Sequence, residues 1–185
     1  MVSAGAPDRG ASAAGAVGDR VRDQRARLEA ARAAAARVTD PELPALTIDD
    51  LGILYDVAID EAGTVTVAIL PTYSGCPAMG VIALAIEAEL ANDGFPAARV
   101  RLTNTPAWST ARMSEAGREK LRACGVAPPG RGSGQRALFA PPDVVACPRC
   151  ASPDTERVSE FGSTACKALW RCRACREPFD HFKCI

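Results

Sequence analysis

Two cysteine pairs near the end of the chain, CPRC at residues 147–150 and CRAC at residues 172–175, constrain its fold more than any other feature. The turn of a CxxC pair can direct two sulfurs at one ion, and the 21 residues between the pairs are close to the spacing found in zinc ribbons. Four thiolates at about 2.3 Å satisfy tetrahedral zinc and exclude water from it. The sequence therefore predicts zinc bound by Cys147, Cys150, Cys172 and Cys175, although tetrahedral geometry alone leaves iron open.

The segment that contains these pairs, residues 144–185, has six of the eight cysteines and almost no continuous apolar pattern. So short a segment rarely folds on an apolar core alone, and it needs a metal or disulfides. We expect a four-cysteine zinc-ribbon-like domain. Three further residues of ligand type, Cys166, His181 and Cys184, either pack around the ribbon, bind a second metal or act in redox chemistry. For His181, packing is the favoured interpretation.

The bulk properties of the chain limit its class. Lys plus Arg and Asp plus Glu number 22 each, and this balance disfavours a dedicated nucleic-acid-binding protein. The longest apolar run, residues 81–86, is far shorter than the roughly 20 residues that cross a bilayer. Residues 1–18 lack the charged start and apolar core of a secretory signal. We therefore expect a cytoplasmic location, where cysteines serve as metal ligands or reactive thiols rather than in disulfides.

Composition divides the chain into four zones and predicts an α+β protein. Residues 1–20 are rich in Ala and Gly without periodicity, and we expect a disordered tail. Residues 21–128 alternate helical and strand patterns and predict a small α/β domain. Residues 129–143 are rich in Pro, Gly and Ser, which is typical of a linker, and the cysteine-rich zone follows.

The α/β zone has a definite expected order of elements, and it begins with a helix that overlaps the end of the tail. This helix should dock on the domain through a thin apolar face, with its arginines in solvent. A β-hairpin, a helix with Pro77 in its first turn, a third strand and a helix capped by Ser114 should follow. The expected ranges, in that order, are residues 19–38, 55–60 with 64–70, 76–94, 98–103 and 114–125.

Cys76, in the sequence SGCP, lies where the second helix should begin. The positive end of the helix dipole and free N–H groups there favour the thiolate and predict a lowered pKa. A thiolate at this place can bind a metal or an iron–sulfur cluster, or attack an electrophile, but an inert cysteine fits the position equally well. Asp40, Glu42 or Asp56 could line the same pocket, although the sequence does not show that they meet. Neither a glycine-rich phosphate loop nor an ExxH pair occurs, so redox catalysis by the chain itself is not expected.

Two stretches of the α/β zone resemble a known family. TDPELPALTIDDLGILYDVAI and TVTVAILPTYSGCPAM are similar to the iron–sulfur cluster assembly domain of SufT-like and metal–sulfur cluster biosynthesis proteins, with matches at DPE, DLGILYDV and CP. This resemblance implies that Cys76 is the reactive or cluster-handling thiol. It also implies that Asp40, Glu42 and Thr72 shape the pocket around Cys76, and that iron or an iron–sulfur cluster binds there transiently.

The cysteine-rich zone narrows the resemblance. TPAWSTARMSEAGREKLRACGVAPP, CPRC, FGSTACKALWRC and EPFDHFKCI are similar to the D subunits of multicomponent phenylacetate-CoA oxygenases, also called 1,2-phenylacetyl-CoA epoxidases. The resemblance implies an accessory subunit of aerobic phenylacetate degradation without catalysis of its own. Such a subunit would assist iron or cluster insertion into the oxygenase and its iron–sulfur flavin reductase. It would work beside the other subunits, and self-association as a homodimer stays open.

Three alternative functions remain open from the sequence. The chain could be a stoichiometric structural subunit that holds the oxygenase together, which stable co-purification would favour. It could be an electron-transfer component with iron in the ribbon, which visible colour would reveal because zinc is colourless. A nucleic-acid-binding ribbon is the least favoured alternative, and it would require salt-sensitive binding.

Overall fold

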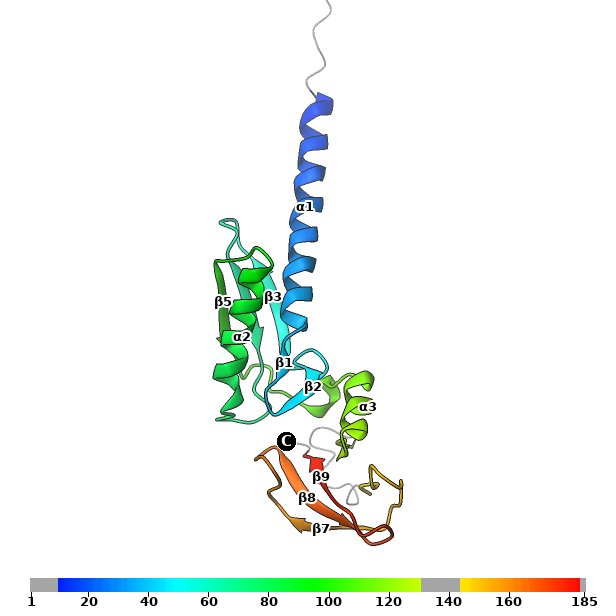
Figure 1. Ribbon diagram of the computed structural model, residues 1–185. Coiled ribbons are helices and arrows are strands. Elements are labelled where there is room, and N and C mark those ends of the chain that lie inside the picture. The colour runs from blue at the N-terminus through cyan, green and yellow to red at the C-terminus, as the bar shows by residue number, and fades with distance from the viewer. Residues whose placement is uncertain (1–9, 131–143, 184–185) are drawn as a thin grey trace, which may run out of the picture.

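The computed structural model describes residues 10–130 and 144–183, and it consists of an α/β unit joined end to end with a small β-sheet unit, the ribbon (Figure 1). Nine strands and three α-helices occur in the described residues, together with one 3₁₀ turn at Thr110–Arg112. Helices and sheets are therefore mixed, as predicted. No helix in these ranges combines the length and the apolar character needed to span a membrane.

The first helix, α1 (Gly10–Ala36), is longer than the sequence predicts. It begins at Gly10 rather than at Asp19, so the helix includes residues 10–20 of the zone expected to be a tail. The alanines of this stretch explain the difference, because alanine has the best helix propensity. Near its end, Ala31, Ala34 and Ala35 are fully buried, as their i, i+3, i+4 spacing allows. The helix docks through this narrow stripe on α2 and β3, and its earlier turns extend beyond the sheet (Figure 1).

The central sheet has three strands in the order β3 (Leu54–Ile59), β4 (Val65–Ile69) and β5 (Ala98–Leu102). Strands β3 and β4 form the predicted antiparallel hairpin. Strand β5 runs parallel to β4, and α2 (Ala78–Asn92) is the crossover between them. The apolar face of α2, formed by Ile82, Ile86 and Leu90 at helical spacing, is fully buried in the core of this unit.

Two smaller elements complete the α/β unit. A short hairpin, β1 (Thr39–Asp40) with β2 (Leu43–Thr47), was not predicted. Helix α3 (Glu115–Ala123) has the predicted cap, since the Ser114 hydroxyl accepts a hydrogen bond from the Gly117 N–H at 2.9 Å. Helix α3 also contacts β2, so both elements lie at the end of the unit that faces the ribbon (Figure 1).

The ribbon is a four-stranded sheet in the order β6 (Val126–Ala127), β9 (Pro178–Phe182), β8 (Lys167–Cys172), β7 (Thr155–Ser159). Strand β6 follows α3 directly, yet it pairs with β9 in the parallel sense. It therefore ties the α/β unit to the ribbon sheet before the expected linker, residues 129–143, of which residues 131–143 lie outside the described residues.

The ribbon and the α/β unit share one apolar core. Phe182 on β9 is 2% exposed and belongs to the same buried cluster as Ile82 and Leu121. Its ring packs against Trp108, with the ring centroids 6.0 Å apart. The Trp108 indole N–H in turn donates to the Leu51 carbonyl at 2.9 Å. The ribbon is therefore not an independent module, because its last strand contributes to the core of the α/β unit.

Candidate metal centre and thiol site

The four cysteines of the two CxxC pairs lie together at one end of the ribbon. Their sulfur atoms all lie within 4.8 Å of one another. The Cys147 and Cys175 sulfurs are 3.7 Å apart, and those of Cys150 and Cys172 are 3.6 Å apart. A tetrahedron with metal–sulfur bonds of about 2.3 Å has edges of about 3.8 Å, so both distances fit four ligands on one ion. The cluster is therefore a candidate metal-binding site, and its donor set fits zinc or iron.

The backbone of both CxxC turns explains how the sulfurs converge. Each pair is followed directly by a residue in the left-handed conformation, Ala151 with φ of 58° and Arg176 with φ of 65°. The turns are closed by matching hydrogen bonds, from the Cys147 N–H to the Ser152 carbonyl and from the Cys172 N–H to the Glu177 carbonyl, both at 3.0 Å. Ala151 and Arg176 are not glycine, so the left-handed conformation costs energy at both positions. This cost indicates that both turns are shaped to direct their two sulfurs at one point.

The thiols of this cluster do not ionise equally. The Cys175 N–H approaches the Cys172 sulfur at 3.5 Å and, together with neighbouring thiols, lowers the pKa of Cys172 to about 7. Burial and the three sulfurs around Cys175 raise its pKa against a favourable hydrogen bond from the Glu177 N–H. The Cys172 thiolate therefore forms more readily than the Cys175 thiolate. Metal binding here must release protons to solvent.

Cys76 lies in the loop between β4 and α2, directly before the N-terminus of α2, as the sequence predicts. The turn is closed by hydrogen bonds from the Cys76 N–H to the Tyr73 carbonyl and from the Met79 N–H to the Cys76 carbonyl, both at 3.3 Å. The side chain is half-buried and packs against the main core. The Ala78 N–H and the Tyr73 hydroxyl both favour the thiolate form of Cys76 and act to lower its pKa.

The prediction of a lowered pKa for Cys76 is wrong. Burial raises the pKa of the Cys76 thiol, and the negative charges of Glu42 and Asp40 raise it further. The Ala78 N–H and the Tyr73 hydroxyl act in the opposite direction, as a helix N-terminus should, but they do not prevail. Cys76 therefore lies at the helix position that was expected. The direction of its pKa shift is decided by burial and by neighbouring carboxylates, which the sequence could not show. Cys76 therefore favours the neutral thiol.

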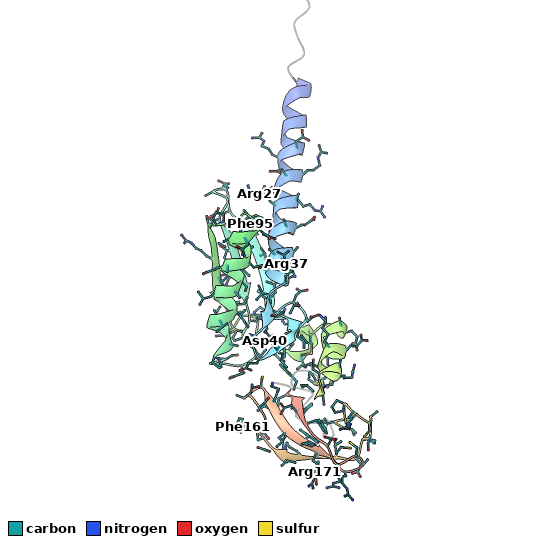
Figure 2. All side chains as sticks on the ribbon, viewed as in Figure 1. Arg27, Arg37, Asp40, Phe95, Phe161 and Arg171 are labelled. Atoms are coloured by element: carbon teal, nitrogen blue, oxygen red, sulfur yellow. The ribbon has the colours of Figure 1, made fainter. Side chains whose placement is uncertain are left out.

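The predicted pocket residues differ in burial and in the hydrogen bonds that they make. The Asp40 carboxylate closes the β1–β2 turn by accepting hydrogen bonds from the Glu42 and Leu43 N–H groups at 2.8 and 2.9 Å, which accounts for its burial. It lies at the end of the α/β unit that faces the ribbon (Figure 2). The Glu42 carboxylate is exposed and does not close this turn, and its negative charge raises the pKa of Cys76. Thr72 is buried in the loop that carries Cys76, whereas Asp56 lies exposed on β3.

Cys166 of the ribbon also lies at this place. Its sulfur is 4.0 Å from the Glu42 carboxylate and 3.0 Å from the Thr164 hydroxyl, and the residue is 7% exposed. It belongs to the core cluster against which Cys76 packs. Burial raises the pKa of Cys166, and the charges of Glu42 and Cys76 act in the same direction. The structure therefore places Cys166 of the ribbon in the core cluster against which Cys76 packs, near enough for the charge of Cys76 to raise the pKa of Cys166.

Cys124 and His181 have separate surroundings. Cys124 is exposed at the end of α3. The imidazole of His181 packs edge-on against Trp170, with the ring centroids 5.7 Å apart, which agrees with the packing interpretation. Cys184 lies outside the described residues.

Sequence reasoning missed Tyr73 and left Cys166 without a role. Burial raises the pKa of Tyr73, and so do the charges of Cys76, Cys166 and Glu42. The Tyr73 hydroxyl is therefore influenced electrostatically by all three groups. The only signal for Tyr73 in the sequence is its place three residues before Cys76. Cys166 carried no such signal, because its approach to Cys76 depends on how the ribbon docks.

Comparisons with known proteins match both units of the chain. The family described as "Iron-sulfur cluster assembly protein" matches residues 28–101, and the family described as "PaaD zinc beta ribbon domain" matches residues 132–183. A crystal structure of a domain of unknown function, DUF59, from Bacillus anthracis is similar with a TM-score of 0.50 at 30% identity, over 55% of this chain and 96% of that one. Together with the four-cysteine cluster, these matches confirm the predicted fold class.

Two curated relatives carry functional names. The chain is 50% identical over 149 residues to the putative D subunit of 1,2-phenylacetyl-CoA epoxidase from Escherichia coli (strain K12), covering 80% of this chain and 88% of the relative. It is 34% identical over 79 residues to the "Fe-S protein maturation auxiliary factor" of Porphyromonas gingivalis (strain ATCC BAA-308 / W83), covering 42% of this chain and 74% of the relative. The second similarity is confined to a shorter part of the chain than the first.

Proposed function

Because the chain belongs to the family of the D subunits of 1,2-phenylacetyl-CoA epoxidase, we propose that it is the accessory subunit that matures this oxygenase in aerobic phenylacetate catabolism. Its cargo is iron or an iron–sulfur cluster, and its recipients are the oxygenase and the iron–sulfur flavin reductase. The observation that carries the proposal is the half-buried Cys76 at the start of α2, within a domain of the iron–sulfur assembly family and beside Glu42.

The thiol site is suited to hold cargo and release it. Cys76 is a protonated thiol in the absence of a cation, so it gains its charge when iron arrives and its proton leaves. Glu42 adds a negative charge that attracts the cation, and it is exposed rather than committed to a turn. The Tyr73 hydroxyl donates toward the sulfur and would orient it. Asp40 closes the β1–β2 turn, and Thr72 is buried in the loop that carries Cys76.

The ribbon cluster has a different role in this proposal. Its four thiols form a complete tetrahedral set, and a closed set of this kind suits structural zinc, which adds to folding free energy directly. The ribbon would then be a zinc-stabilised docking module for the other subunits.

Replacing one ligand tests the ribbon assignment. Cys147→Ser removes a buried sulfur from the tetrahedron, so we expect the purified variant to have lost most of its zinc and its ordered ribbon. Elemental analysis by plasma mass spectrometry measures the metal, and the exposed Cys124→Ser is the matched control. Wild-type metal content in Cys147→Ser would contradict the assignment, and iron in place of zinc would support an electron-transfer component.

The maturation role is tested on the recipients. The other epoxidase subunits are produced with the wild-type chain, with Cys76→Ser, with Cys124→Ser or without the chain, and their iron content and activity are then measured. We expect iron-poor, inactive subunits without the chain and with Cys76→Ser, and no rescue by later addition of purified chain. Iron-replete subunits whose activity returns on simple mixing would instead identify a stoichiometric working subunit and overturn maturation.

A further inference from the structure

The β7–β8 loop of the ribbon is built to present Cys166 to the α/β unit. Gly162 donates its N–H to the Lys167 carbonyl at 2.8 Å and closes the loop. The Asp180 carboxylate, on β9, accepts hydrogen bonds from the Ser163 hydroxyl at 2.6 Å and from the Ser163 N–H at 3.3 Å. The Cys166 carbonyl accepts from the Lys183 N–H at 2.9 Å. The loop is therefore tied to Asp180 of β9 and to Lys183 directly after it, and Phe182 of the same strand enters the shared core.

The close packing of this loop leaves little freedom in where Cys166 lies. A Cβ on Gly162 would lie 2.3 Å from an oxygen of the Asp180 carboxylate and 3.3 Å from the Ala168 backbone, so the loop packs closely on this side chain of β9. Thr164 then places its hydroxyl 3.0 Å from the Cys166 sulfur. This arrangement directs the sulfur at the α/β unit, where the Glu42 carboxylate is 4.0 Å away.

We propose that Cys166 is a second thiol ligand of the cargo site, and that with Cys76 and Glu42 it forms a two-sulfur, one-carboxylate site for ferrous iron between the ribbon and the α/β unit. This inference rests on the proposed function, and it gives the ribbon a direct part in binding the cargo. Thiolates favour iron and zinc among the common metals, and a carboxylate is an accepted ligand of ferrous iron.

The arrangement differs from the ribbon cluster in a way that fits cargo. Within residues 10–130 and 144–183, the four ribbon cysteines are the one group of three or more ligand-type residues whose ligand atoms all lie within 4.8 Å. Cys76, Cys166 and Glu42 are thus more open, and side-chain rotation must bring them onto an ion. A site with three protein ligands leaves a coordination position free, as transfer to a recipient requires.

Cobalt binding tests the site directly. Cobalt(II) is added without oxygen to the reduced, zinc-loaded full-length protein, and thiolate-to-cobalt charge-transfer absorption is followed while elemental analysis monitors the ribbon zinc. We expect one cobalt per chain with zinc retained. Cys76→Ser and Cys166→Ser should each weaken cobalt binding at least about tenfold, while Cys124→Ser should bind like the wild type. Equal binding by Cys166→Ser and the wild type, or no cobalt beyond what replaces zinc, would overturn the proposal.

A measurement on the wild type keeps the test independent of how the variants fold. Alkylation of each cysteine is followed by peptide mass spectrometry with and without cobalt or ferrous iron. We expect the metal to protect Cys76 and Cys166 together and to leave Cys124 unchanged. Protection of Cys76 alone would overturn the shared site.

The maturation assay separates this inference from the function on which it rests. If Cys166→Ser matures the recipients fully while Cys76→Ser does not, the second ligand is wrong and the proposed function stands. If metal protects both thiols but the recipients acquire iron without the chain, the site stands and the maturation function is wrong.

Discussion

The charge state of Cys76 is decided by its neighbours rather than by its helix. The Ala78 N–H at the start of α2 favours the thiolate, and in an isolated helix this effect would prevail. Burial and the two carboxylates of the β1–β2 turn oppose it and raise the pKa. A site that keeps its thiol protonated is protected from stray alkylation and oxidation, yet it can still exchange its proton for a metal.

Removing the charge of Glu42 should therefore make Cys76 more reactive. In Glu42→Gln the pKa of Cys76 falls, because a negative charge that disfavours the thiolate is gone. The thiolate fraction at pH 7 to 8 then rises, and iodoacetamide should modify Cys76 faster. Peptide mass spectrometry measures the rate, with Cys124 as the reference in the same molecule and the exposed Glu61→Gln as the matched variant. An unchanged or slower rate at Cys76 would show that Glu42 does not act on the thiol.

Asp50 gives a second prediction at the scale of one residue. Its carboxylate accepts hydrogen bonds from the Lys120 ammonium at 2.6 Å and from the Thr47 N–H at 3.1 Å. Burial alone would raise the pKa of Asp50, but these partners outweigh burial and lower it. A lowered folded-state pKa means that the ionised carboxylate stabilises the fold above its unfolded pKa of about 3.9. This stabilisation disappears as the pH falls through the folded-state pKa.

Asp50→Asn should thus lose stability at pH 7 and lose less relative to the wild type as the solution is acidified. Urea unfolding between about pH 3 and 7 measures the difference in unfolding free energy, and the neighbouring Asp49→Asn is the control because its side chain is 51% exposed. A difference that is independent of pH would contradict the role of the Asp50 charge.

At the scale of elements, α3 is held against the loop after β2 by a close backbone approach. A Cβ on Gly117 would lie 2.7 Å from the Asp50 carbonyl oxygen, which itself accepts the Ser114 N–H at 2.9 Å. Gly117→Ala should therefore push α3 away and cost roughly 1–3 kcal/mol of unfolding free energy. Gly80→Ala in α2 is the matched control, because its Cβ meets nothing within 4 Å and alanine should add about 0.5–1 kcal/mol there. Urea unfolding measures both changes, and equal effects would contradict the close approach.

The elements that were predictable are those with a local pattern. Alternation and the EAG loop predicted the β3–β4 hairpin, and Pro77 and Gly94 marked the limits of α2. Strand β6 was not predictable, because two residues carry no period and their pairing with β9 is a long-range event. The cysteine spacing likewise predicted which sulfurs converge in the ribbon. The meeting of Cys76, Glu42 and Cys166 depends on docking between units and had no local signature.

At the scale of the whole molecule, the ribbon and the α/β unit should unfold together. Phe182 brings the last ribbon strand into the core of the α/β unit, beside Trp108. Phe182→Ala removes a ring that is 2% exposed and should cost about 3–5 kcal/mol. Because the core is shared, this loss should lower the unfolding midpoint of both units at once.

The test compares two phenylalanines of the same ribbon. Phe161→Ala is the matched control, since Phe161 is 63% exposed, and it should change the midpoint little. Thermal unfolding is followed by far-ultraviolet circular dichroism for the whole fold and by a zinc indicator for the ribbon. We expect both signals to shift together in Phe182→Ala. An early release of zinc with the main transition unchanged would mean that the ribbon unfolds by itself, and Cys166 would then lack the rigid support that a shared iron site requires.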